Sequence, residues 1–266
     1  MPTAKTSTKK PAPSKTSKTK PRMSFAEAMS ELKKAGSAQT KKTYTRHGAT
    51  EPMFGVSFAT LKILTKRIDV DHELAFALWE TGNFDARNLA VKIVDPARMT
   101  SADLDRWAVE TSMSRMCGGY VGMLAAEGPH GAKKAAEWLA SSDLRKRSAG
   151  WSLLGQLAQR DETIPDSFFE KRLAEIERSI HGAPNAEREL MNMAVVMMGL
   201  RNRGLKKAAL AAAKRIGKVE VDHGDTACKT PDAAEYIEKT WAHATSKGFE
   251  SPAAAERKRE VPRRRC

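Results

Sequence analysis

Short helical segments, each with its own start and stop signals, follow one another along almost the whole chain. Ser24 and Glu27 have the spacing of a capping box, and Gly36 is placed to end the helix that they begin. Asp71 is a helix-capping residue ahead of an apolar run that stops at Gly82. Apolar residues recur with the helical period elsewhere, so we predict further helices at 57–68, 83–95, 117–126, 131–140, 142–159, 165–180, 186–200 and 203–216, with two more beginning at 100 and 230.

This succession of helices predicts an all-α protein. Residues 219–221 form the only short candidate for a strand. About a dozen short helices joined by short loops do not suggest one compact bundle, but helix hairpins stacked side by side, each burying a face of the next. We therefore expect a solenoid, an α-α superhelix whose inner wall is an extended concave binding surface.

The excess positive charge is concentrated in a few places. The formal net charge is +14. Residues 1–22 carry seven Lys or Arg and no acid, residues 190–219 carry the same, and residues 247–266 carry seven basic and three acidic side chains. Such a distribution favours a polyanionic partner. We expect this partner to be duplex DNA, bound by a monomer.

Composition divides the chain into three parts. Residues 1–22 alternate Lys, Pro, Ser and Thr with almost nothing to bury, which predicts a disordered basic tail. Residues 247–266 are expected to be a second basic tail, and residues 23–246 the folded domain. No apolar run approaches the roughly 20 residues that span a bilayer, and the three cysteines do not suggest a disulfide framework. We therefore expect a cytoplasmic, nucleoid-associated bacterial protein with no membrane partner.

Three clusters of basic residues are candidates for phosphate contacts. On the helix from Arg203, three basic residues share a face that no acid of the same segment offsets, although acids in 222–235 could balance it as an ordinary solvated surface. A similar pattern occurs on the helix at 57–68, and a third cluster opens the helix at 142–159, where the helix N-terminus would also attract a phosphate. The predicted DNA contacts are Lys62, Lys66, Arg145, Lys146, Arg147, Arg203, Lys207 and Lys214. Phosphate contacts of this kind imply no sequence specificity.

The most polar stretch of the body is 222–230. Its His223, Asp225 and Cys228 could ligate zinc, or Cys228 could act as a nucleophile, but only one Cys and one His are local. We favour a hydrogen-bonded connector in which Gly224 turns the chain and Thr230 caps the last helix. No metal and no cofactor is predicted.

The five tryptophans lie at helical positions among apolar residues. We predict that most of them belong to the core, because a buried Trp contributes a large apolar area. One exposed in the groove could stack on a base.

Several stretches together resemble the DNA alkylation repair family. They are 44–48 (YTRHG), 53–57 (MFGVS), 71–79 (DHELAFALW), 81–90 (TGNFDARNLA), 147–151 (RSAGW) and 216–232 (IGKVEVDHGDTACKTPD). The resemblance implies HEAT-like helical repeats that clasp duplex DNA in a concave basic groove. It also implies a relation to enzymes that excise alkylated purines by hydrolysing the N-glycosidic bond.

The chain departs from the family where excision takes place. Family excision depends on a carboxylate, flanked by tryptophans, that stabilises positive charge on the departing nucleoside. In the stretch of this chain that corresponds, Met113 replaces a Trp and Cys117 replaces the Asp, and Met197 replaces a later Trp of the groove. A neutral thiol or a methionine cannot supply negative charge. We therefore predict a DNA-binding protein with lost or weak glycosylase chemistry, and assign no catalytic residue.

The resemblance also assigns roles to two arginines. Arg147 falls where the family places a phosphate contact, which supports the cluster at the start of the helix 142–159. Arg87 matches a family arginine too, but a structural salt bridge is its expected role.

Two other functions remain open at this stage. One is an active DNA glycosylase that uses a different acid, for which Glu110, Asp105 and Glu127 are candidates. The other is a helical-repeat scaffold that binds a protein, with the basic tails serving solubility.

Overall fold

The computed structural model describes residues 22–111 and 115–259, without the side chains of 115–118, and its regular elements in this part are all helices. The α-helices are α1 Phe25–Ala35, α2 Ala38–Arg46, α3 Phe58–Ile68, α4 His72–Glu80, α5 Phe84–Ile93, α6 Ser101–Glu110, α7 Arg115–Glu127, α8 Gly131–Leu139, α9 Leu144–Arg160, α10 Asp166–Ser179, α11 Asn185–Gly199, α12 Arg203–Ile216, α13 Ala233–Ser246 and α14 Pro252–Arg257, with 3-10 turns η1 Pro96–Arg98 and η2 Ile180–Gly182. The predicted all-α class is confirmed.

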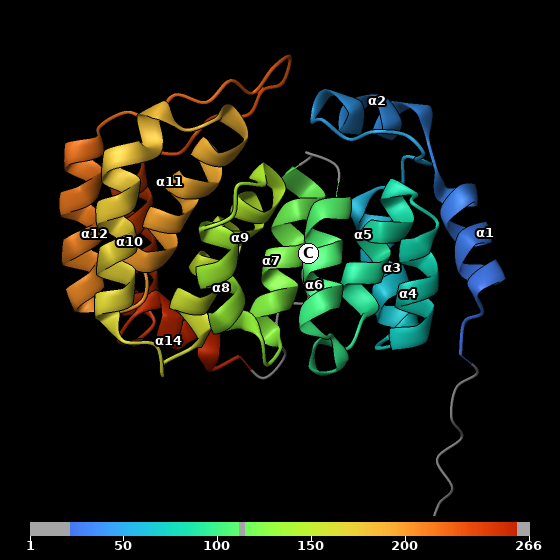
Figure 1. The fold of residues 1–266 in the computed structure, drawn as a ribbon, viewed down its shortest axis with the longest axis horizontal. Coiled ribbons are helices and arrows are strands. Elements are labelled where there is room, and N and C mark those ends of the chain that lie inside the picture. Colours follow the sequence, from blue (N-terminus) through green and yellow to red (C-terminus); the bar gives the residue numbers. More distant parts are fainter. Residues whose placement is uncertain (1–21, 112–114, 260–266) are drawn as a thin grey trace, which may run out of the picture.

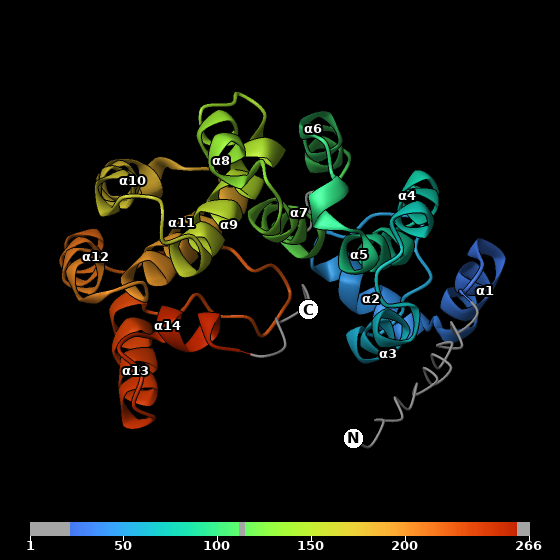
Figure 2. The ribbon, with the colours of Figure 1, turned by 90° about the horizontal axis from the view of Figure 1, so that it is seen from below.

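The helices form two rows that curve around a common concave side. Figure 1 shows them side by side, and Figure 2, from below, shows α4, α6, α8, α10 and α12 in the outer row. The inner row consists of α3, α5, α7, α9, α11 and α13, whose successive members contact one another. Helix α14 packs against α9 and α13 on the concave side. This arrangement is the predicted stack of helix hairpins, and no helix of the described part is long and apolar enough to cross a membrane.

The start signals identified in the sequence form as expected. Ser24 and Glu27 make a complete capping box, in which the backbone N–H of Glu27 donates to Ser24 Oγ at 3.2 Å and that of Ser24 to Glu27 Oε2 at 2.7 Å. The Asp71 side chain accepts from the backbone N–H of Leu74 at 3.0 Å. Each such cap satisfies backbone donors that the first helical turn leaves without a partner.

All five tryptophans are buried, each at most 4% exposed. Trp79 and Trp107 stack with ring centroids 3.9 Å apart, which fixes α4 against α6. The indole N–H groups of Trp79 and Trp138 donate to Glu110 at 2.5 Å and to Asp105 at 2.7 Å. The prediction that most tryptophans are core is confirmed, and the idea of one exposed in the groove is wrong, because all five rings are buried.

Helices α7 and α9 approach closely because glycine removes a side chain from their crossing. A Cβ atom at Gly122 would lie 2.6 Å from the carbonyl oxygen of Ala149. At Gly119, one turn earlier, the nearest atom to such a Cβ would be 4.0 Å away. Only Gly122 is therefore required for the contact.

A buried arginine joins α12 to the helices before it. Arg201 is 6% exposed, and its guanidinium donates to the carbonyl oxygens of Ala158, Asp161 and Ile164 at 2.8–3.0 Å and to the Asp166 carboxylate at 3.1 Å. One side chain thus satisfies three carbonyl groups at the end of α9 and in the loop that follows.

The structure differs from the sequence prediction at the ends of the domain. Helix α2 was not predicted, because of its nine residues only Tyr44 is buried and the apolar period is missing. Residues 247–266 were expected to be a tail, but α14 folds onto the body with Pro252 and Ala253 buried. The apolar run PAAA that makes this contact is too short to show a period. Of the predicted tails, 1–22 and 247–266, residues 1–21 and 260–266 lie outside the described residues.

Two smaller predictions fail around the last long connection. Residues 219–221 form no strand, and the carbonyl oxygen of Glu220 accepts from the side chain of Arg188 on α11 at 2.8 Å. Thr230 does not cap α13, because Asp232 does so by accepting from the backbone N–H of Glu235 at 2.8 Å.

Candidate nucleic-acid interface

One arm of the concave side is formed by α3. The Phe58 ring at its start lies 6.4 Å from the ring of Tyr120 on α7, so this face of α3 is turned toward α7. Lys62 and Lys66 follow one and two turns later on the same face, and both are exposed. Among the residues that the structure describes, neither lysine has an acidic partner within ion-pair distance. These two predicted contacts therefore present free charge to the concave side.

Hydrogen bonds to the backbone just before α3 hold this arm in place. The buried Asp85 carboxylate accepts from the backbone N–H groups of Phe54, Gly55 and Val56 at 2.6–2.9 Å. The three residues lead directly into the Ser57 cap of α3, whose side chain accepts from the N–H of Thr60. The position of the two lysines is thus fixed by a buried charge on α5.

The other arm is formed by α13 and α14, which border a cavity of about 630 Å³. We call it the inner cavity. Helices α7, α9 and α11 contribute its floor through Met123, Gln156 and Met197. Its remaining lining residues are Gln159, Arg160, Leu200, Tyr236, Thr240, His243, Ala244, Lys247, Phe249, Pro252, Ala255, Glu256, Lys258 and Arg259. A basic lining on this arm was not predicted, because residues from 247 onward were assigned to a tail.

The cluster at the start of α9 is held by neighbouring acids. Arg145 pairs with Asp143 at 2.8 Å, and Lys146 lies 3.7 Å from Asp105. A hydrogen bond from Arg145 lowers the pKa of Asp143 to about 2, so this cap stays charged at any physiological pH.

Arg147 is even more fully engaged. Its guanidinium pairs with the buried Glu187 at 2.6 Å and donates to the carbonyl oxygens of Ser141 and Ser142 at 2.9–3.0 Å. The structure therefore gives Arg147 a role in joining α9 to α11. A phosphate contact from this cluster stays a prediction.

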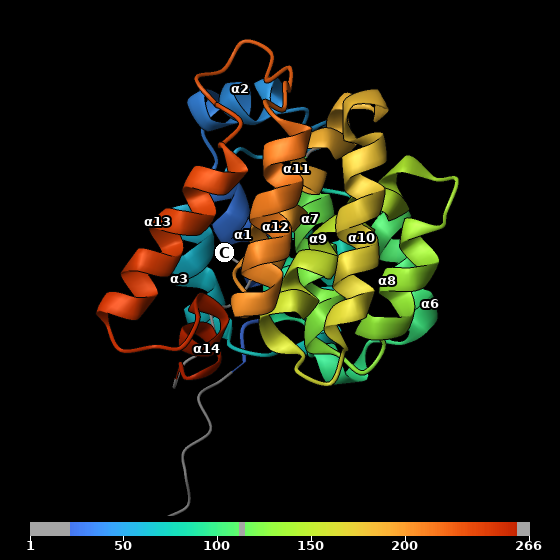
Figure 3. The ribbon, with the colours of Figure 1, turned by 90° about the vertical axis from the view of Figure 1, so that its left-hand side faces the viewer.

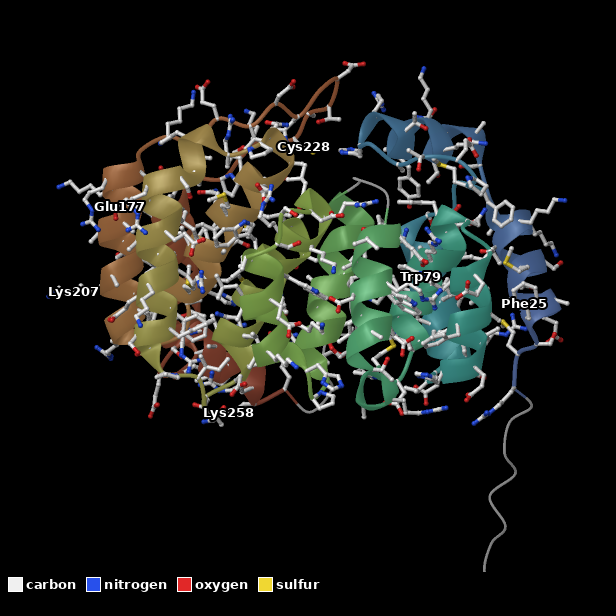
Figure 4. All side chains as sticks on the ribbon, in the orientation of Figure 1. Phe25, Trp79, Glu177, Lys207, Cys228 and Lys258 are labelled. Carbon is white, nitrogen blue, oxygen red and sulfur yellow. The ribbon has the colours of Figure 1, made fainter. Side chains whose placement is uncertain are left out.

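The third cluster lies away from the concave side. Arg203, Lys207 and Lys214 are exposed on α12, a helix of the outer row. Figure 4 shows Lys207 at the outer edge of the molecule, pointing away from the body, and in Figure 3 α12 stands at the front of this end. The expectation that all three clusters line one groove is wrong, since the periodicity of a helix reveals its free face but not the row in which it packs.

The three acids considered for glycosylase chemistry all have structural partners. Glu110 accepts a hydrogen bond from the indole of Trp79, and its carboxylate lies 3.7 Å from the guanidinium of Arg87. Arg87 also donates to the backbone carbonyl of Glu110. The expected salt bridge of Arg87 is therefore confirmed. Glu127 pairs with Arg160 at 3.1 Å.

Asp105 is the third of these acids. It accepts from Lys134 at 2.6 Å and from the indole of Trp138 at 2.7 Å. Burial alone would raise the pKa of Asp105, but these two hydrogen bonds and the charges of Lys134 and Lys146 outweigh it and hold the pKa below its ordinary value. The side chains of Met113 and Cys117 lie outside the described residues.

The long connection 217–231 is fastened to α11 by polar side chains. Asn185 exchanges two hydrogen bonds of 2.8 Å with the backbone of Asp222, and Asn192 donates to the carbonyl of Pro231 at 2.9 Å. His223 pairs with Thr230 at 2.9 Å, as expected of a hydrogen-bonded connector. Within the described part of the chain, no three His, Cys, Asp or Glu residues are grouped so that they could hold a metal ion.

The tip of this connection lies close to the end of α2. Gly224, which has a φ of 59°, turns the chain as predicted. A Cβ atom at Gly224 would lie 4.0 Å from the carbonyl oxygen of Arg46 at the end of α2. Figure 1 shows the connection and α2 meeting above the inner row.

Comparison with known proteins gives consistent results. An uncharacterized protein of Listeria monocytogenes, Lmo0209, is 27% identical over 223 residues, which cover 82% of this chain and 97% of the relative, and Lin0241 of Listeria innocua gives the same values. A solved structure of "a new family of proteins related to the HEAT-like repeat DNA glycosylases with affinity for branched DNA structures" is 33% identical, with a TM-score of 0.76, over 86% of this chain and 98% of that one. The profile of the family described as "DNA alkylation repair enzyme" matches residues 28–237. With its HEAT-like helical repeats, the chain thus belongs to the DNA alkylation repair enzyme family.

Proposed function

We propose that this protein binds DNA along its concave side, prefers branched DNA to a continuous duplex, and does not excise bases. The observation that carries the proposal is the placement of free cations on both arms of the concave side. Lys62 and Lys66 stand on α3, and Lys247 and Lys258 stand across from them around the inner cavity. The outer-row cluster on α12 is not required.

Free lysines facing one hollow are suited to a phosphate backbone. Each phosphate that a lysine neutralises releases condensed counterions, which favours binding at low salt. Most other cations of the inner row already pair with an acid, as Arg160 does with Glu127. Contacts of this kind recognise the path of the backbone and not the bases. A protein that reads backbone paths can favour a branch, which is consistent with the branched-DNA affinity of the similar solved structure.

The engagement of the three candidate carboxylates argues against base excision. A glycosylase needs an acid whose charge is available at the sugar carbon when the base departs. Glu110, Asp105 and Glu127 each hold a tryptophan, a lysine or an arginine of the scaffold. Moving any of them to a substrate would leave a partly buried partner without its hydrogen bond, which costs about 1–3 kcal/mol.

Two measurements on the full-length protein test the proposal. The first compares binding to a four-way junction, a flap and a continuous duplex of equal length at two salt concentrations. We expect the tightest binding to branched DNA, with affinity that falls steeply as salt rises. The second measures release of methylated purines from alkylated duplex, and we expect none above the level without protein.

The outcomes separate the three functions considered. Base release that one carboxylate substitution abolishes would make the protein a glycosylase. Equal affinity for all three DNAs would remove the branch preference. A lack of binding at low salt would leave a scaffold for a protein partner, whose apolar interface would respond little to salt.

A further inference from the structure

The inner cavity has features that duplex binding alone does not use. It lies between the ends of α9 and α11 and the arm made by α13 and α14. Four Lys or Arg residues line it, namely Arg160, Lys247, Lys258 and Arg259, against the single acid Glu256. A cavity with more basic than acidic side chains attracts a small anion more strongly than an open surface does, because its walls focus the electrostatic field.

Some of these cations have partners and others do not. Arg160 is held by Glu127 at 3.1 Å, and Arg259 by Glu256 at 2.8 Å. Lys247 has no ion pair in the described part of the chain, and the ammonium of Lys258 lies 5.9 Å from the ring of Phe249, without an acid among the described residues in ion-pair range. Two ammonium groups on the cavity rim are thus free for a phosphate.

An exposed aromatic ring lies on the same wall. Tyr236 is 44% exposed, in contrast to the five buried tryptophans. Thr240, His243 and Lys247 follow it on α13 at the spacing of one helical face and also line the cavity. A ring that remains open beside free lysines matches the way proteins hold single-stranded nucleic acid, with bases stacked on aromatic faces and phosphates on cations.

The length of the wall indicates how much strand it accommodates. Tyr236 and Lys247 are eleven positions apart, which corresponds to about 16.5 Å along the helix axis at about 1.5 Å per residue. A single base contacting Tyr236 does not reach Lys247. Two linked nucleotides do, so a short piece of strand fits this wall better than a free mononucleotide.

We propose that the inner cavity binds two unpaired nucleotides of a DNA strand, with a base stacked on Tyr236 and phosphates held by Lys247 and Lys258. This inference rests on the proposed function and deepens it, because a branch supplies unpaired nucleotides beside a duplex. The duplex then lies along the inner row and the unpaired strand enters the cavity.

The test uses a duplex with a flap of two nucleotides, one of which is the fluorescent base 2-aminopurine. Stacking on Tyr236 quenches this base when the protein binds. Tyr236→Leu removes the aromatic face and keeps an apolar side chain, and Phe25→Leu is the matched control, since Phe25 is also exposed (43%) but lies on α1 at the far end of the molecule from Lys258 (Figure 4). Lys247→Gln is compared with Lys239→Gln, which is exposed on α13 outside the cavity lining.

Tyr236→Leu is expected to abolish the quenching and to weaken flap binding about 5- to 150-fold, the range for loss of one stacked base. Tyr236→Leu should bind the continuous duplex as tightly as the wild type does. Phe25→Leu should match the wild type with both DNAs. Lys247→Gln should weaken flap binding more than Lys239→Gln does.

Four results would overturn the proposal. Tyr236→Leu could weaken binding to the flap and to the continuous duplex equally. It could also leave flap binding unaffected. In both cases the wild type still binds DNA, so the proposed function would stand. Free dAMP could bind to the wild type and not to Tyr236→Leu, while the substitution leaves flap binding unchanged. That result would assign the cavity to a mononucleotide. Failure of the wild type to bind any DNA would remove both proposals.

Discussion

Replacement of the two lysines on α3 tests where DNA lies on this protein. The sequence alone proposes both Lys62 and Lys66 and the α12 cluster of Arg203, Lys207 and Lys214 as contacts, with the basic stretch 190–219 as the strongest signal, whereas the structure separates them onto the concave side and the outer row. A protein with Gln at 62 and 66 is therefore compared with one that has Gln at 203, 207 and 214.

The expected size of the effect follows from the number of charges removed. Each neutralised phosphate contributes about 0.9 to the slope of log affinity against log salt, so loss of two contacts lowers the slope by about 1.8. At about 0.1 M salt the same relation corresponds to an affinity up to about 60-fold weaker. The α12 triple variant removes more charge but is expected to leave the slope nearly unchanged.

Fluorescence anisotropy of a labelled four-way junction, titrated between about 50 and 200 mM salt, measures both slopes. All five side chains are exposed, so their replacement should change the free energy of unfolding by less than about 0.5 kcal/mol each, which urea unfolding verifies. A slope that falls by about 2.7 in the α12 variant and stays constant in the α3 variant would refute the placement of DNA on the concave side.

Three further predictions concern the scaffold that supports this surface. Arg201→Met should lower the free energy of unfolding by about 3–5 kcal/mol, because it leaves buried carbonyl groups unpaired, whereas Arg215→Met at an exposed pair should have a much smaller effect in the same urea titration. Gly122→Ala should lower the melting temperature through a clash worth about 1–3 kcal/mol, and Gly119→Ala should not; equal effects would contradict the close helix crossing. The lowered pKa of Asp143, about 2 against an ordinary 3.8, stabilises the folded state above about pH 4, and this contribution disappears as pH falls toward 2. Unfolding of Asp143→Asn followed against pH should therefore converge with wild type near pH 2, and a constant difference would argue against the shift.

Local signals in the sequence were sufficient for most of the fold. Caps such as Ser24 with Glu27 and Asp71 act within one helical turn, so the positions of these helices depend on neighbours in the chain. The stacking of hairpins also followed, because short connections force successive helices to pack on each other. The family resemblance, the HEAT-like fold and the burial of the tryptophans are confirmed.

The parts that could not be predicted depend on contacts between distant segments. Helix α2 lacks an apolar period, and α14 contributes only a short apolar run that packs against α9, about a hundred residues earlier. The row to which α12 belongs is set by the whole stack, so its basic face could not be assigned to the concave side or the outside. The inner cavity needs five helices at once, although the spacing of Tyr236, Thr240, His243 and Lys247 was a signal that could have been noticed.

The approach of the 217–231 connection to α2 has a mechanical consequence. A helical-repeat stack behaves like a spring, because small rotations at each repeat add up to a large change in the distance between its ends. Here a Cβ atom at Gly224 would lie 4.0 Å from the carbonyl oxygen of Arg46, so the connection between α12 and α13 lies beside α2 at the other end of the stack. A change in the curvature of the arc would therefore also change the separation of these two segments.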